Sequence, residues 1–153
     1  MAQTTAQKNI PLFNLELQHK AIQKEINEEV IKTLQSMKFL LGPQNEAFEK
    51  SFAQLIGTKH CVTCASGYAA LWLGLWACDI KEGDEVITSP LTFIATTAAV
   101  STTGAKFVLA DVDPVTACLS PEQAARKITA KTKAIILRRS EEHTSELQSR
   151  YVI

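Results

Sequence analysis

The chain has 153 residues, of which 46% are apolar and 21% are charged. This composition is typical of a globular protein with a buried core and excludes a disordered or collagen-like chain. The sixteen basic and sixteen acidic residues cancel, so the charge balance does not favour nucleic acid as a partner.

Two helices are predicted near the start of the chain. Residues 1–16 form a polar leader without the apolar segment of a secretory signal. An amphipathic helix is predicted over residues 17–36, because four apolar side chains recur there at intervals of four. These are Ile22, Ile26, Val30 and Leu34.

A second helix is predicted after a break at residues 38–43. Asn45 is a suitable N-cap residue, and Gly57 is a suitable residue to end the helix. The side chains expected to be buried on this helix are Phe48, Phe52 and Leu55.

From His60 onward, short apolar runs alternate with helical segments. We expect strands at residues 61–63, 85–88, 106–110 and 132–137, and helices at residues 68–78, 93–102 and 121–128. Ser120 and Pro121 provide the cap and first position of the last helix. Strands separated by helices predict the α/β fold class, with a parallel sheet covered on both faces.

Two uncharged stretches, residues 61–78 and 86–105, are interrupted by Ser-Gly and Ser-Pro pairs. A membrane span would be more uniformly apolar, so we expect buried elements of a soluble, cytoplasmic protein with no membrane partner.

Four cysteines include one Cys-x-x-Cys pair, Cys61 and Cys64. In a strand these two side chains would point to opposite faces, and the three histidines are scattered along the chain. We therefore expect no metal site, but core cysteines in a reducing compartment.

Three turns are candidate sites, because ligands of parallel sheets bind at the carboxyl ends of strands. Residues 65–68 place a glycine at a helix N-terminus, where free N–H groups and the helix dipole suit a phosphate. The ring of Phe93 either stacks on a planar cofactor or packs in the core. Asp111 and Asp113 offer carboxylates, or simply form a turn before Pro114.

The chain resembles the DegT/StrS-type aminotransferases in five segments, in order and spacing, from about residue 10 to residue 136. The segments are LLGPQNEAFEKSFAQLIG, SGYAALWLGL, KEGDEVITSPLTFIATTAAV, GAKFVLADVD and TKAII. The resemblance implies an enzyme that uses pyridoxal phosphate to transfer an amino group from an amino acid to a nucleotide-linked keto-sugar. It also implies a truncated fold type I aminotransferase large domain and, in the full-length protein, a homodimer.

The resemblance assigns the cofactor-binding residues. It implies that Gly67, Tyr68 and Ala69 hold the cofactor phosphate through backbone amides, and that Phe93 stacks on the pyridine ring. Tyr68 stands where the family commonly has Thr, and Ala98 stands where Asn is frequent. The phosphate contacts expected here are therefore contacts of the backbone.

The substrate-binding positions of the family have a match in this chain, but its catalytic positions do not. Leu40, Leu41 and Gly42 match a segment near the substrate entrance. The Schiff-base lysine and the aspartate that pairs with the pyridine nitrogen have no matching position among the 153 residues. We therefore assign no catalytic residue and expect the chain as printed to be inactive.

Residues 139–149, RSEEHTSELQS, resemble the translation of a common sequencing-library adapter. The expected regions are a leader (1–16), a partial pyridoxal-phosphate-binding large domain (17–137) and a non-native tail (138–153). Two alternatives to the transaminase stay open. One is a non-catalytic cofactor-binding or dimerisation module, and the other is a keto-sugar dehydratase of the same family.

Overall fold

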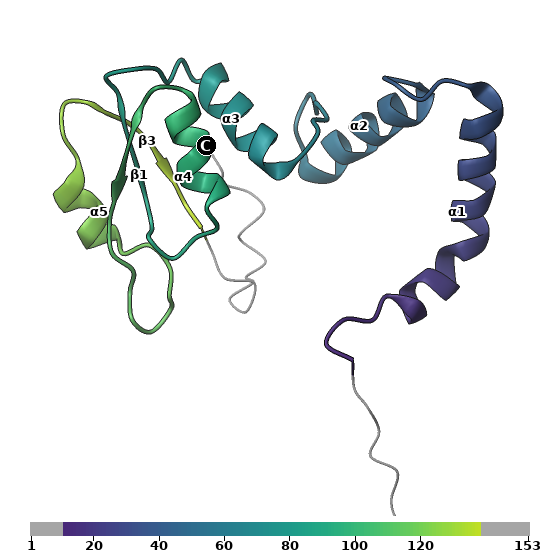
Figure 1. Cartoon of the computed structure of the whole chain (residues 1–153), viewed down its shortest axis with the longest axis horizontal. Helices are drawn as coiled ribbons and strands as arrows, with labels where there is room; N and C mark the ends of the chain where they lie inside the picture. Colours follow the sequence, from purple (N-terminus) through teal and green to yellow (C-terminus); the bar gives the residue numbers. More distant parts are fainter. Residues whose placement is uncertain (1–10, 139–153) are drawn as a thin grey trace, which may run out of the picture.

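A computed structural model describes residues 11–138 of the chain (Figure 1). The leader up to residue 10 and the expected tail beyond Arg138 lie outside the described residues. The described helices are α1 (Glu16–Ser36), α2 (Pro43–Ile56), α3 (Gly67–Ala77), α4 (Ala95–Thr102) and α5 (Pro121–Lys127). The described strands are β1 (Glu85–Thr88), β2 (Lys106–Leu109) and β3 (Thr132–Ile136).

The two N-terminal helices form where the sequence predicts them, but the predicted cap of α2 is wrong. This helix begins at Pro43, whose fixed backbone angle suits the first helical position, and Gly42 precedes it as the N-cap residue. Its end is as expected: Gly57 takes the left-handed conformation (φ +76°), and its N–H donates to the carbonyl of Gln54.

The three strands form a parallel sheet in the order β2–β1–β3, which confirms the expected sheet type. Val86, in the central strand, packs with residues of α3 and α4 on one face. Its neighbour Ile87 points to the other face and packs with Leu119 and with Ala124 of α5. Both side chains are fully buried, so the sheet is covered on both faces, as the alternation of elements predicts.

The strand expected at residues 61–63 is wrong, because these residues are not in a strand. A strand needs a neighbouring strand for its backbone hydrogen bonds, and Thr63 instead bonds to side chains of α2. The helix expected from about residue 93 is present and starts two residues later. This helix, α4, begins at Ala95 and leaves Phe93 in the preceding loop.

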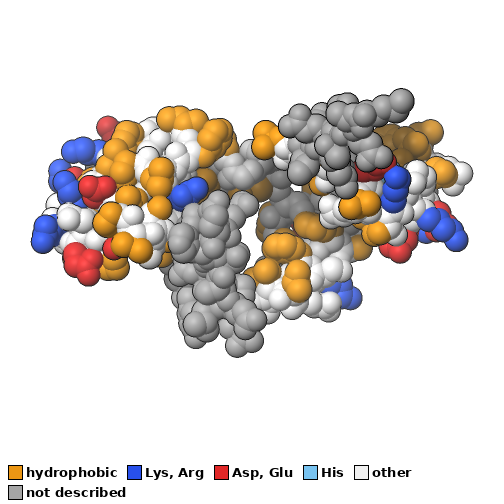
Figure 2. All heavy atoms as spheres, turned by 90° about the horizontal axis from the view of Figure 1, so that it is seen from below, with side chains coloured by type: hydrophobic (Ala, Val, Ile, Leu, Met, Phe, Trp, Pro, Cys, Tyr) orange, Lys and Arg blue, Asp and Glu red, His pale blue; other side chains and the backbone are white. Residues whose placement is uncertain are grey.

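The apolar stripes of α1 and α2 are correctly placed in the sequence, but the burial expected for Phe48, Phe52 and Leu55 of α2 is wrong. No residue of α1 is buried, and on α2 only Ala53 is. Figure 1 shows both helices extending to one side of the sheet, with no second layer against them. Figure 2 shows apolar side chains exposed over the sheet at one end of the molecule and over the N-terminal helices at the other. The exposed side chains on these helices include Ile22, Ile26, Val30, Leu34, Phe48, Phe52 and Leu55.

No described helix combines the length and apolar character needed to cross a membrane. All four cysteines are free thiols, but the expectation that they lie in the core is wrong for Cys64 and Cys78, which are exposed. Among residues 11–138, no cluster of three His, Cys, Asp or Glu side chains is arranged to hold a metal ion.

Candidate functional site

The N-terminus of α3 has the features of an anion-binding turn. Ser66 is its N-cap residue, and the backbone N–H of Ala69 donates to Ser66 Oγ (3.2 Å). The N–H groups of Gly67 and Tyr68 form no hydrogen bond within residues 11–138. A Cβ atom added to Gly67 would meet nothing within 4 Å. A phosphate group therefore fits here, against two free donors and the positive end of the helix dipole.

The three residues expected at the phosphate differ in what they offer. The amide of Ala69 is already bonded to Ser66, so the free amides belong to Gly67 and Tyr68. The Tyr68 hydroxyl lies 2.6 Å from Thr102 Oγ1, and this bond joins α3 to α4. The Tyr68 side chain is thus engaged in helix packing, and its backbone is the part available to an anion.

Phe93 lies in the loop between β1 and α4, and the residue is 77% exposed. The alternative that this ring packs in the core is therefore wrong for the described residues. The start of the loop is well fixed, because Ser89 is buried and its Oγ accepts the N–H of Leu91 (3.0 Å). A fixed loop with an exposed ring leaves an aromatic face free to stack on a planar group.

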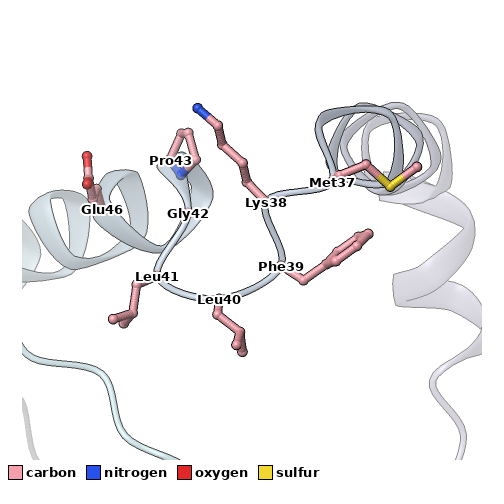
Figure 3. Close-up of a pocket in the computed structure, with 8 residues that line it drawn as sticks. All are labelled: Met37, Lys38, Phe39, Leu40, Leu41, Gly42, Pro43 and Glu46. Carbon is pink, nitrogen blue, oxygen red and sulfur yellow. The ribbon is translucent and has the colours of Figure 1, made fainter.

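The predicted substrate segment forms the loop between α1 and α2. Leu40, Leu41 and Gly42 line an open depression of about 570 Å³ together with Glu46 (Figure 3). The two leucine side chains point to the same side of this loop, and Lys38 points to the opposite side. Leu41 has a left-handed backbone (φ +48°), which is unusual for a branched side chain and makes this loop locally strained.

A second depression, of about 330 Å³, brings the substrate segment beside the chain that enters the phosphate turn. Ala65 on its wall directly precedes Ser66, the N-cap of α3. The structure therefore places the predicted substrate segment beside the predicted phosphate turn. The lining residues are Phe39, Leu40, Leu41, Asn45, Thr63, Cys64 and Ala65.

Sequence reasoning missed a polar cluster at this wall. The backbone N–H of Thr63 donates to Glu49 Oε1 (2.8 Å), and Thr63 Oγ1 lies 2.8 Å from both Glu49 Oε1 and Asn45 Oδ1. The hydrogen bonds from Thr63, first of all the one from its backbone, lower the pKa of the Glu49 carboxyl. Thr63 lies outside α2, which carries Asn45 and Glu49, so no periodic pattern within one element indicated this cluster.

The carboxylate turn at Asp113 has a structural role. Its Oδ1 accepts the backbone N–H groups of Val115 (3.0 Å) and Thr116 (2.8 Å). These bonds lower the pKa of the Asp113 carboxyl, the bond from Thr116 most. Of the two alternatives for this residue, the structure favours the turn.

Fold and site together define a class: an α/β domain with a parallel sheet and a phosphate-sized anion site at a helix N-terminus. Residues 20–145 match the DegT/DnrJ/EryC1/StrS aminotransferase family. The chain belongs to this family.

The chain is 39% identical over 128 residues to the dTDP-3-amino-3,6-dideoxy-alpha-D-galactopyranose transaminase of Aneurinibacillus thermoaerophilus, covering 84% of this chain and 35% of the relative. The structure resembles DesV of S. venezuelae in complex with a ketimine intermediate, with a TM-score of 0.84 and 33% identity. The match covers 92% of this chain and 38% of DesV.

The structure also resembles NtdA of Bacillus subtilis with its bound cofactor PMP, with a TM-score of 0.82 and 27% identity. This match covers 97% of this chain and 34% of NtdA. The chain thus spans about a third of the length of the curated relatives it matches. The expected fold type I aminotransferase class is confirmed for the portion of that fold that the chain covers.

Proposed function

We propose that this chain is the N-terminal part of an aminotransferase that uses pyridoxal phosphate to move an amino group from an amino acid to a nucleotide-linked keto-sugar. One observation carries the proposal. Within the family match at residues 20–145, the turn that the resemblance assigns to the cofactor phosphate has two backbone amides without a hydrogen-bond partner among residues 11–138. The dTDP-sugar transaminase and the PMP complex among its relatives support the substrate class and the cofactor.

Five of the seven predicted site residues then have a role. The amides of Gly67 and Tyr68 bind the phosphate, and the ring of Phe93 stacks on the pyridine. Leu40 and Leu41 border the space for the sugar. The bound cofactor supplies the electron sink for the amino transfer, and the residues of this chain hold and orient it.

We further propose that the protein is a cytoplasmic homodimer. The exposed apolar stripes of α1 and α2 support association, since large exposed apolar patches mark surfaces that bind other chains. We also propose that residues 17–137 are the cofactor-binding part and that the chain from residue 138 is not native. One observation counts against a non-native tail: the family match reaches residue 145, past the start of the adapter-like segment. Resequencing the gene beyond the codon for Leu137 tests this assignment directly.

The functional test is a chimera, named here the chimeric enzyme. Residues 20–137 replace the matching segment of the Aneurinibacillus thermoaerophilus transaminase. We expect the chimeric enzyme to bind pyridoxal phosphate and to transaminate that relative's sugar nucleotide. Its matched control carries Gly67→Val and should bind the cofactor more weakly.

The outcomes separate the candidate functions. A folded chimeric enzyme that does not bind the cofactor contradicts the proposal. Cofactor binding without turnover favours the non-catalytic module. The resequenced gene separates transaminase from dehydratase, because the family's dehydratases carry histidine in place of the Schiff-base lysine.

A further inference from the structure

We propose that Glu49 is a positioning residue that, through Thr63, holds the phosphate turn at Ser66 and Gly67 beside the substrate segment. This inference rests on the proposed function, because only that function assigns the cofactor phosphate to the turn at Ser66 and Gly67. Glu49 itself is not among the residues that line the two depressions.

The first argument concerns the hydrogen bonds between Thr63 and α2, called the link below. Within residues 11–138, every hydrogen bond that joins α2 to a distant part of the chain ends on Thr63. The hydroxyl of Thr63 has one hydrogen and faces two acceptors, so it donates to only one of them at a time. The backbone N–H has Glu49 as its one acceptor, which makes the carboxylate the constant member of the link.

The second argument is that residues 58–66 have little structural support apart from this link. Residues 58–66 contain no helix or strand, and Val62 is 82% exposed. Thr63, by contrast, is half-buried against α2. Three residues span at most about 10 Å even when extended, so the position of Thr63 limits where Ser66 can lie.

The third argument is the position of the link. Asn45 and Thr63 both line the depression that also contains Leu40 and Ala65. The link therefore stands between the predicted substrate segment and the predicted phosphate turn. A carboxylate that accepts a backbone N–H forms a charge-assisted hydrogen bond, which is stronger and more directional than a neutral one.

The test compares Glu49→Ala with Glu49→Gln in the chimeric enzyme. Amide hydrogen exchange of the cofactor-free protein should rise about tenfold at Thr63 in Glu49→Ala, the size expected for one lost hydrogen bond to a charged group. The rise should be confined to residues 61–69. Glutamine keeps an oxygen acceptor, so Glu49→Gln should restore most of the protection. Lys50→Gln changes the charge at the next position of α2 and should leave this exchange unchanged.

The second readout is cofactor affinity. Titration with pyridoxal phosphate should show a loss of about tenfold in Glu49→Ala, again the size of one such bond, with recovery in Glu49→Gln. Thr63→Val keeps the backbone N–H and removes the hydroxyl, so its effect should be smaller than that of Glu49→Ala.

Each result decides one question. Unchanged exchange at Thr63 in Glu49→Ala overturns the inference, and so does a rise spread evenly over β1 and α4, which would indicate general destabilisation. If exchange responds as expected but no variant binds pyridoxal phosphate, the proposed function fails and the structural link stands.

Discussion

Gly42 shows how a single residue fixes the geometry of the substrate segment. It is buried, and a Cβ atom added there would lie 2.6 Å from the carbonyl oxygen of Lys38. That oxygen belongs to the backbone and cannot rotate away, so any side chain at Gly42 must displace the loop that carries Leu40 and Leu41.

We expect Gly42→Ala to lower the free energy of unfolding of the chimeric enzyme by about 1–3 kcal/mol, the range for overpacking. The matched control is Gly74→Ala in α3, where a Cβ meets nothing within 4 Å. That change should raise stability by about 0.5–1 kcal/mol, because glycine is a poor residue inside a helix. Urea unfolding measures both, and equal effects would contradict the steric argument.

At the phosphate turn, we expect Gly67→Val to be worse than Tyr68→Thr. Valine is branched at Cβ, so its side chain has few rotamers and blocks the close approach of an anion to the backbone. Threonine in place of Tyr68 keeps the backbone N–H that binds the anion. Titration of the chimeric enzyme with pyridoxal phosphate should show at least about a tenfold loss for Gly67→Val, the size of one charge-assisted bond. Loss of binding in Tyr68→Thr alone would mean that the turn is misassigned.

The carboxyl of Glu49 predicts a pH dependence of stability. Its pKa lies below the usual 4.5 in the folded chain, because Thr63 donates hydrogen bonds to the carboxylate. The ionised form therefore stabilises the fold above the unfolded-state pKa, and this contribution is lost as pH falls through the folded-state pKa. Asp113 contributes with the same sign.

Urea unfolding of the chimeric enzyme between about pH 6 and pH 3 should show stability falling below about pH 4.5. Glu49→Gln cannot titrate and should flatten part of that slope. Glu46→Gln is the control, since the Glu46 side chain forms no hydrogen bond among residues 11–138. A slope that Glu49→Gln leaves unchanged would show that the carboxylate does not stabilise the fold.

At the scale of the element, α5 shows how a cap defines a helix that has only seven residues. Ser120 Oγ accepts the N–H of Gln123 (3.3 Å) and donates to Glu122 Oε2 (2.9 Å). A helix this short is marginal by itself, so capping and the burial of Ala124 against Ile87 decide whether it forms.

Ser120→Ala should therefore cost about 1 kcal/mol in the free energy of unfolding of the chimeric enzyme, as for other N-cap serines. Ser51→Ala, on the exposed surface of α2, is the matched control and should stay within about 0.5 kcal/mol of the parent. If the two changes cost the same, the cap does not stabilise α5.

At the scale of the molecule, the notable feature is uncovered apolar surface. The stripes of α1 and α2 are exposed, and β2 and β3 are both edges of the described sheet. Ile135 in β3 is partly exposed as well. Parallel sheets are normally covered and their edges protected, because open edges pair with other chains.

We therefore expect the 153-residue chain as printed to associate or precipitate when expressed, and not to transaminate. Light scattering on the purified chain measures the first. An assay with pyridoxal phosphate, an amino acid and a nucleotide keto-sugar measures the second. A soluble, monodisperse chain with turnover would contradict both expectations.

The local elements could be predicted from the sequence because their signals are local. Gly57 ends α2 through its own backbone freedom, and Ser120 with Pro121 begins α5 by capping chemistry. The alternation of strand and helix also predicts the parallel sheet, since such connections allow little else. The candidate phosphate turn followed from the same kind of local signal, a glycine at the start of a helix.

The tertiary structure alone decided what these elements contact. An apolar stripe requires a partner for burial but does not identify that partner, so the sequence placed the stripe of α2 correctly and its burial wrongly. Residues 61–63 have the composition of a strand, yet a strand exists only where another strand offers hydrogen bonds. The pairing of Thr63 with Glu49 joins a loop residue to a helix that ends before it, so only the path of the folded chain brings them together.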